Sequence, residues 1–135
     1  MSVPHKPHKV SEYLQEAAHN LAFAAEIRKD KVEYLDWAAT CLFYAAVHYV
    51  NAYFVKSKIA IPRRHTSPDR KPPGRTNIVQ QDPKLSAIYS HYRHLDDESR
   101  DARFELKQIS GADYDNFLLP ELEKVKKFIT PKVTA

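Results

Sequence analysis

Apolar residues recur every three or four positions along most of this chain, a spacing that predicts helices. Asp30 and Glu33 have the spacing of a capping box and mark the start of the second helix. Asp82 followed by Pro83 supplies a cap and then a first-turn proline for the third. The pattern predicts four main helices, at about residues 11–28, 30–58, 83–107 and 113–129.

The last two predicted helices each have one apolar face. We expect five residues of the third helix to share a face, namely Tyr92, Leu95, Ser99, Ala102 and Leu106. In the last helix we expect an inward face of Phe117, Leu118, Leu122, Val125, Phe128 and Ile129. With short loops joining antiparallel neighbours, the sequence predicts an all-α, four- to five-helix antiparallel bundle.

The middle of the second helix, residues 37–55, is uncharged and apolar on all sides. A helix of this kind is enclosed on most sides. Its length would allow a membrane span, but tyrosines, Thr40, His48 and Asn51 dilute it and the mean hydropathy of the chain is −0.57. We therefore predict no membrane association. The aromatic surface along this helix exceeds what one small bundle is expected to bury, so we predict a homodimer.

The chain has the size of one domain, with 135 residues and a mass of 15.6 kDa. Only two glycines are present, which favours helices over a sheet. We divide the sequence into a basic, disordered tail at 1–10 and a single helical domain at 11–130. Cys41 has no partner for an internal disulfide, and the N-terminal residues do not resemble a signal peptide, so a cytoplasmic location is predicted.

The basic charge is concentrated in one segment. Residues 56–75 hold seven Lys and Arg and one acid, whereas the formal net charge of the chain is +4. Much of this segment belongs to a loop that we predict at residues 59–82, where prolines and Gly74 interrupt any helix. A local field of one sign attracts anions. The candidate anion-binding residues are Arg63, Arg64, His65, Arg70 and Arg75; the alternative is that the charge only keeps the loop solvated.

Few residues suggest catalysis or metal binding. The sequence has no glycine-rich phosphate loop, nucleophile elbow, zinc ribbon or H-E-x-x-H site. The close pair His91 and His94 has no obvious carboxylate partner, so no metal and no cofactor are predicted. His48 lies on the enclosed helix, where it is either a core histidine or a functional one. Arg103 borders the apolar stripe of the third helix and needs an anion, from the protein or from a ligand.

Three stretches together resemble the HEPN-domain proteins. They are W-A-A-T-x-x-F-Y-A-A-x-H-x-x-x-A-Y from Trp37 to Tyr53, P-x-x-H-x-x-x-x-R from Pro62 to Arg70, and Y-x-x-Y-x-x-L-x-x-x-S-x-x-A-R-F from Tyr89 to Phe104. The resemblance covers roughly residues 30–107. It implies a HEPN-like antiparallel bundle, frequent homodimers, association with nucleotides or RNA, and in many members metal-independent ribonuclease activity in toxin-antitoxin or phage-defence systems.

The nuclease motif of that family is absent from this chain. It is an arginine followed after four to six residues by histidine, and none of the arginines here has a histidine at that spacing. The nearest arrangements run in reverse, from His65 to Arg70 and from His94 to Arg100. The departure argues against the family's catalytic site but leaves the fold expectation intact.

Three functions remain open. The first is a noncatalytic HEPN-like module that binds a nucleotide, RNA or an acidic partner protein, in the setting of a prokaryotic toxin-antitoxin or defence system. The second is a ribonuclease with a relocated site, in which His48 or His65 acts as acid or base and Arg70, Arg100 or Arg103 stabilises the developing charge. The third is a dimerisation domain without a ligand.

Overall fold

The computed structural model describes residues 8–65 and 73–134 of the chain. Every regular element in these ranges is helical, so the prediction of an all-α fold is confirmed. The longer helices are α1 (Val10–Asp30), α2 (Leu35–Lys56), α4 (Tyr89–Phe104) and α6 (Leu119–Thr134). The shorter elements are η1 (Val32–Tyr34), α3 (Arg75–Gln81), η2 (Ser86–Ile88), α5 (Gly111–Asp113) and η3 (Tyr114–Leu118).

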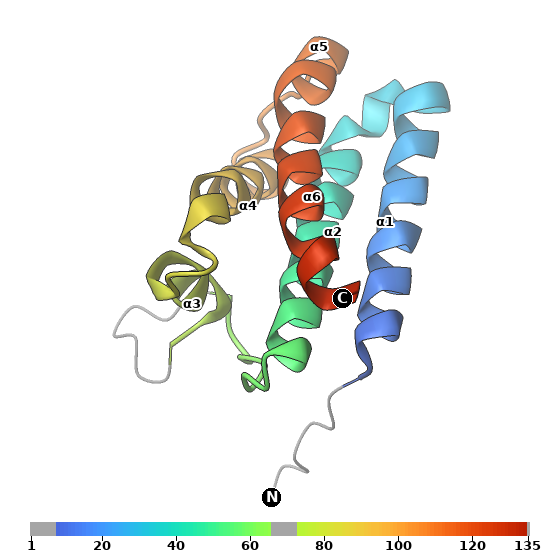
Figure 1. The fold of residues 1–135 in the computed structure, drawn as a ribbon. Helices are drawn as coiled ribbons and strands as arrows, with labels where there is room; N and C mark the ends of the chain where they lie inside the picture. The colour runs from blue at the N-terminus through green and yellow to red at the C-terminus, as the bar shows by residue number, and fades with distance from the viewer. Residues whose placement is uncertain (1–7, 66–72, 135) are drawn as a thin grey trace, which may run out of the picture.

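Helix α2 is the centre of the bundle. It contacts α1, α4 and α6, and α1 runs antiparallel to it in Figure 1. Its side chains supply more of the core than those of any other described helix, and Leu42, Val50 and Phe54 are completely buried. The segment Val32–Lys56 is long and apolar enough to cross a membrane, but 78% of its most apolar window is buried by the rest of the chain. The core helix of a globular protein is commonly as long and as apolar as a membrane-spanning helix.

The first two helices differ from the predicted boundaries at their junction. Asp30 is the last residue of α1 and does not cap a second helix, and the short 3₁₀ turn η1 precedes α2, which begins at Leu35. At the other end, α1 begins at Val10, and Lys9 is the N-cap residue. The backbone N–H of Lys9 donates to the side chain of Glu12. The predicted tail therefore ends earlier than residue 10, and its residues 1–7 lie outside the described part.

The predicted loop at 59–82 is wrong over its last third, where Arg75–Gln81 form helix α3. Prolines exclude a helix from the earlier part of the segment, but the sequence after Gly74 contains none until Pro83. Asp82 ends α3 and does not start the next long helix, because its carbonyl accepts the N–H groups of Leu85 and Ser86 in a turn. Helix α4 begins only at Tyr89.

Two predicted core residues are exposed. Leu106 lies beyond the end of α4, with φ of 56°, and is 81% exposed. Phe117 is 58% exposed because Tyr114–Leu118 form a π-helical turn. A π turn holds more residues than an α turn, which rotates the side chains relative to a regular helix. Tyr114 and Leu118 consequently point inward while Phe117 faces out.

The structure removes the reason for which the sequence predicted a homodimer. The apolar middle of α2 is largely covered by its own chain, so it does not supply the surplus surface that the sequence suggested. The exposed large apolar residues of the described chain lie mostly elsewhere, and they are Phe23, Val32, Tyr34, Trp37, Phe104, Leu106 and Phe117. The homodimer stays a prediction and now needs a different surface.

The π turn gives a direct test of the fold. Leu122→Ala removes a completely buried side chain and should lower the free energy of unfolding by about 2–5 kcal/mol. Phe117→Ala should change it by less than about 1 kcal/mol, because that side chain is mostly exposed. Urea denaturation measures both values. An equal, large loss in the two variants would mean that the last helix has the regular register expected from the sequence.

Candidate anion-binding site

Arg75 is a buried arginine that connects the basic segment to the central helix. It is the first residue of α3 and is 7% exposed. Its Nε donates to Asn51 Oδ1 of α2 at 2.9 Å, its Nη1 contacts His65 Nδ1 at 2.9 Å, and its Nη2 makes a longer contact of 3.4 Å with the Pro62 carbonyl. One guanidinium therefore holds Pro62 and His65, which precede residues 66–72, and α3, which follows them, against α2.

The backbone reinforces this connection. The N–H of Arg75 donates to the carbonyl of Arg64 at 2.9 Å, and the N–H of Thr76 donates to the carbonyl of His65 at 2.6 Å. The first amides of a helix lack partners within the helix and must find them elsewhere. Here the preceding loop supplies them, so the described residues on either side of the 66–72 segment lie next to each other.

His65 is held in one tautomer. Its ring lies against Phe43 and Tyr44 of α2, with ring centres 5.4 and 6.3 Å away. Arginine is always a donor, so the contact with Arg75 requires His65 Nδ1 to accept. The neutral ring then carries its proton on Nε2. His65 can donate through Nε2 while Nδ1 is occupied.

The charges around His65 are mostly positive. Burial lowers the pKa of His65, and the nearby Arg75 lowers it further. Arg100 and Arg103 of α4 add to this lowering of the pKa, and Asp96 opposes it. His65 is therefore within electrostatic reach of three guanidinium groups and one carboxylate, and the field favours an anion over a second proton.

Two buried hydroxyls beside Arg75 have no hydrogen-bond partner among the residues that the structure describes. Tyr92 is completely buried, with its ring edge against Phe43, and Thr76 is 2% exposed. The Tyr92 hydroxyl lies near Arg75 and Thr76, but neither hydroxyl oxygen has a partner of acceptable geometry. Burial raises the pKa of Tyr92, so the phenol stays protonated and able to donate. A buried polar group without a partner is costly and needs an explanation.

Helix α4 contributes one buried carboxylate and two arginines. Asp96 is 3% exposed and accepts a hydrogen bond from Arg100 Nε at 3.0 Å. Arg103 Nε donates to the Ser99 carbonyl at 3.1 Å, and its guanidinium lies 5.1 Å from the centre of the Phe104 ring. Arg103 therefore uses a carbonyl and an aromatic ring, where the sequence suggested an anion.

The four candidate arginines of the basic segment divide into three groups. Arg63 and Arg64 are exposed, as expected of loop residues. Arg70 lies outside the described residues. Arg75, which was predicted to lie in the loop, is instead the first residue of α3, and its side chain is buried and bonded to the protein. No local pattern indicates this burial, because Asn51 is 24 residues away in the chain.

His48 lies in a different place from His65. It stacks on Tyr13 of α1 with ring centres 6.2 Å apart, and it lines a groove of about 500 Å³ together with Glu12, Glu16 and His19. Burial lowers the pKa of His48, and its Nδ1 is buried with no hydrogen-bond partner within residues 8–65 and 73–134. Of the proposed acid or base residues, only His65 therefore lies beside Arg100 and Arg103.

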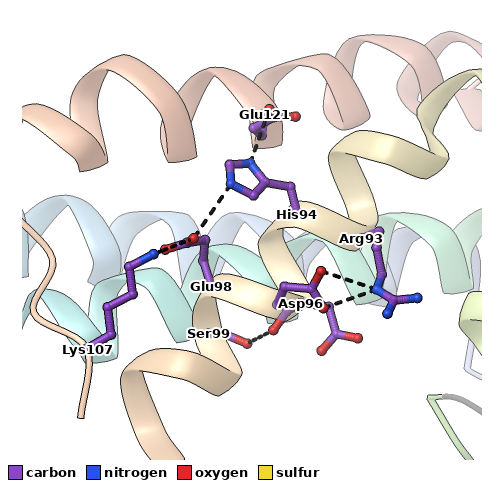
Figure 2. A network of polar contacts seen from close by, with 8 residues as sticks. Arg93, His94, Asp96, Glu98, Ser99, Lys107 and Glu121 are labelled. Atoms are coloured by element: carbon purple, nitrogen blue, oxygen red, sulfur yellow. Dashed lines mark hydrogen bonds and ion pairs between the residues drawn. The ribbon is translucent and has the colours of Figure 1, made fainter. Parts of the chain in front are cut away.

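A polar network fixes the opposite side of α4 (Figure 2). Glu121 of α6 accepts from His94 Nδ1 at 3.3 Å, as Figure 2 shows, and it also accepts from His91 Nδ1. Glu98 contacts His94 Nε2 at 3.7 Å and accepts from Lys107 at 2.7 Å. The carboxylate partner that the histidine pair lacked in the sequence thus comes from another helix. Within the described ranges, no three His, Cys, Asp or Glu side chains are arranged to hold a metal ion.

We expect Arg75 to stabilise the fold, in contrast to the exposed arginines. Arg75→Gln should lower the free energy of unfolding by about 2–4 kcal/mol, because it leaves buried acceptors without a charged donor. The matched control is Arg63→Gln with Arg64→Gln, which should change it by less than about 0.5 kcal/mol. Chemical denaturation gives both values. Stability equal to that of the parent in Arg75→Gln would refute the structural role.

The histidines make stability depend on pH. Because the pKa of both His48 and His65 is lowered by folding, the unfolded chain binds protons that the folded chain does not. Their contribution is complete above the unfolded pKa of about 6.5 and is lost as pH falls through the lower folded values.

Unfolding free energies measured between pH 7.5 and pH 5 should therefore decline in the parent. His65→Asn keeps an acceptor near the position of Nδ1 and should reduce this slope. His19→Asn, at an exposed position of α1, is the control. An unchanged slope in His65→Asn would exclude His65 as a source.

Comparisons of the chain with models of protein families, with curated proteins and with solved structures found no match. The likeness to HEPN proteins rests on the residue pattern alone.

Proposed function

We propose that this chain is a noncatalytic, HEPN-like binding module that holds a phosphate group of RNA or of a nucleotide beside Arg75. The observation that carries the proposal is the buried Arg75 guanidinium, whose described hydrogen-bond partners are all neutral. A buried charge is stable only when it is paired or well bonded. An anionic ligand would supply the missing charge.

The donor groups fit a small oxyanion. A guanidinium has five N–H donors, and three of those of Arg75 have described acceptors, one of them at the long distance of 3.4 Å. The remaining two N–H groups and the hydroxyls of Tyr92 and Thr76 are close to one another. Guanidinium forks match phosphate oxygens well. Together these groups can donate several hydrogen bonds to one phosphate.

The surroundings favour a ligand with more than one phosphate. Arg63 and Arg64 are exposed next to His65, and Arg100 and Arg103 add positive charge on the α4 side. Tyr44 and His65 also present aromatic rings at this place. Aromatic rings beside basic side chains are the usual elements of single-strand nucleic-acid sites. The chemistry supports RNA or a nucleotide ahead of an acidic protein.

The same geometry argues for binding without cleavage. General base catalysis needs an imidazole nitrogen with a free lone pair. In His65 the lone pair of Nδ1 is used by Arg75, and Nε2 carries the proton. The buried carboxylate of Asp96 is bonded to Arg100, and His48 lies in a separate groove. No described pair of acid and base faces the site.

Salt-dependent binding tests this proposal. Affinity for a single-stranded RNA oligonucleotide should fall linearly on a log-log plot against salt concentration, with a slope of about −0.7 per neutralised phosphate. Arg63→Gln with Arg64→Gln should flatten the slope by roughly 1.4, whereas Lys124→Gln with Lys127→Gln, on the outer face of α6, should leave it unchanged. Fluorescence anisotropy gives the affinities.

The buried Tyr92 hydroxyl allows a second test of the proposal. Tyr92→Phe keeps the volume of the side chain and removes a donor, so phosphate or RNA binding should weaken several-fold while folding is retained. If the parent cuts the RNA and His65→Ala abolishes the cut, the relocated ribonuclease is right. If neither RNA nor nucleotide binds at low salt, the proposal fails and a domain without a ligand remains.

A further inference from the structure

One face of α2 is left open by the helices around it. Trp37, Cys41, Tyr44 and His48 follow one another at spacings of four, three and four residues, so they form a strip along a single side of the helix. Trp37 is 53% exposed, and the other three are partly exposed in a helix that is otherwise mostly buried. We call these four residues the α2 strip.

The edge of the strip formed by α1 is acidic. Glu12 and Glu16 line the groove beside His48, which places this side of α1 next to the strip. At helical spacing from Glu16 the same side continues to Phe23, Glu26 and Asp30. All of these residues are exposed. The acidic rim is defined by Glu12, Glu16, Glu26 and Asp30.

The opposite edge of the strip is basic. The ring of His65 contacts Tyr44, which brings the exposed Arg63 and Arg64 to this edge. Arg100 and Arg103 lie near His65 and continue the edge along α4. The side chain of Arg100 remains 49% exposed despite its bond to Asp96. The basic rim is defined by Arg63, Arg64, Arg100 and Arg103.

We propose that this face binds the same face of a second copy of the chain, with a two-fold axis parallel to α2. A rotation about that axis places the α2 strips against each other and exchanges the two edges. The acidic rim of each copy then meets the basic rim of the other, and every contact occurs twice. An axis across α2 would instead place acid against acid and base against base, which is unfavourable.

The charges also match in their position along the strip. Glu12 and Glu16 lie at the His48 end, and Arg63 and Arg64 lie near Tyr44 and His65. Because α1 runs antiparallel to α2, Asp30 lies at the Trp37 end. Ala102 of α4 lines a groove with Leu35 and Asp36, so Arg103 lies at that end as well. The parallel axis keeps each acid at the level of an arginine.

The apolar area is suitable for a modest interface. Phe23, Trp37 and Phe104 are each at least half exposed. Phe23 lies on the side of α1 that carries the acidic rim, and the Phe104 ring contacts Arg103 of the basic rim. Side chains of this size bury about 150–250 Å² when fully enclosed, so their exposed parts supply roughly 300–400 Å². A stable interface buries about 800 Å² on each copy. The rims and the rest of the α2 strip supply the remainder.

The first test is the mass of the protein in solution. It is measured on the full chain after nucleic acid has been removed, so that RNA cannot bridge two copies. Light scattering should give a dimer at tens of micromolar, and the dimer should weaken as salt rises. Trp37→Ala should raise the dissociation constant at least tenfold, because exposed aromatic anchors dominate interfaces. Phe117→Ala, which also removes an exposed aromatic ring but from η3, is the matched control and should not.

Charge reversal tests the pairing of the rims. Glu16→Arg with Glu26→Arg removes the net negative charge of the acidic rim, and Arg63→Glu with Arg64→Glu removes the net positive charge of the basic rim. Each double variant should be monomeric alone, and an equal mixture of the two should form a heterodimer. Lys124→Glu with Lys127→Glu, on α6, has the same charge change as the second variant and should still dimerise.

Three results would overturn the inference. A monomer mass for the parent at tens of micromolar would exclude the dimer. Equal weakening by Trp37→Ala and Phe117→Ala would place the interface elsewhere. A mixture of the two charge-reversed variants that stays monomeric, with both variants folded by circular dichroism, would exclude the pairing of acidic and basic rims. RNA binding by the monomer would not bear on any of these results.

Discussion

The buried guanidinium of Arg75 determines the path of the chain between α2 and α4. A guanidinium in the interior must have acceptors around its edge, and here they are an amide oxygen of α2, a ring nitrogen and a loop carbonyl. Meeting that requirement brings the loop back to the central helix at Pro62 and His65. The tautomer of His65 and the place where α3 begins follow from the same contacts.

Helix α4 connects this site to the rest of the bundle through its two sides. One side is fixed to α6 by Glu121, which accepts from His94 (Figure 2) and from His91 one helical turn before it. The other side presents Asp96 and Arg100 toward the loop. Because a helix is stiff, contacts on one side set the direction of groups on the other. The positive field at His65 therefore depends on residues that do not touch the site.

The sequence predicted features that depend on local composition and missed those that depend on distant contacts. The fold class and the enclosed α2 follow from apolar spacing and are present in the structure. The burial of Arg75 depends on Asn51, and the partner of His91 and His94 is Glu121; both lie far away in the chain. No local signal identifies such pairs.

The errors in the element boundaries have a similar origin. Capping patterns at Asp30 and Asp82 are common in turns as well as at helix starts, and in this chain both residues end a helix. The π turn at Tyr114–Leu118 displaces Phe117 although the residue spacing is that of a regular helix. Tertiary packing decided these details. Local propensity alone was insufficient to predict them.

The central place of α2 has a consequence for synthesis of the protein. This most apolar helix lies in the first half of the chain, while two of the helices that cover it, α4 and α6, are translated later. Domains emerge from the ribosome at about 5–20 residues per second, so α2 is outside the exit tunnel for several seconds before α6 is available. Of the long described helices that contact α2, α1 alone has been made during that interval, so we expect the hairpin of these two helices to expose apolar surface that chaperones can bind.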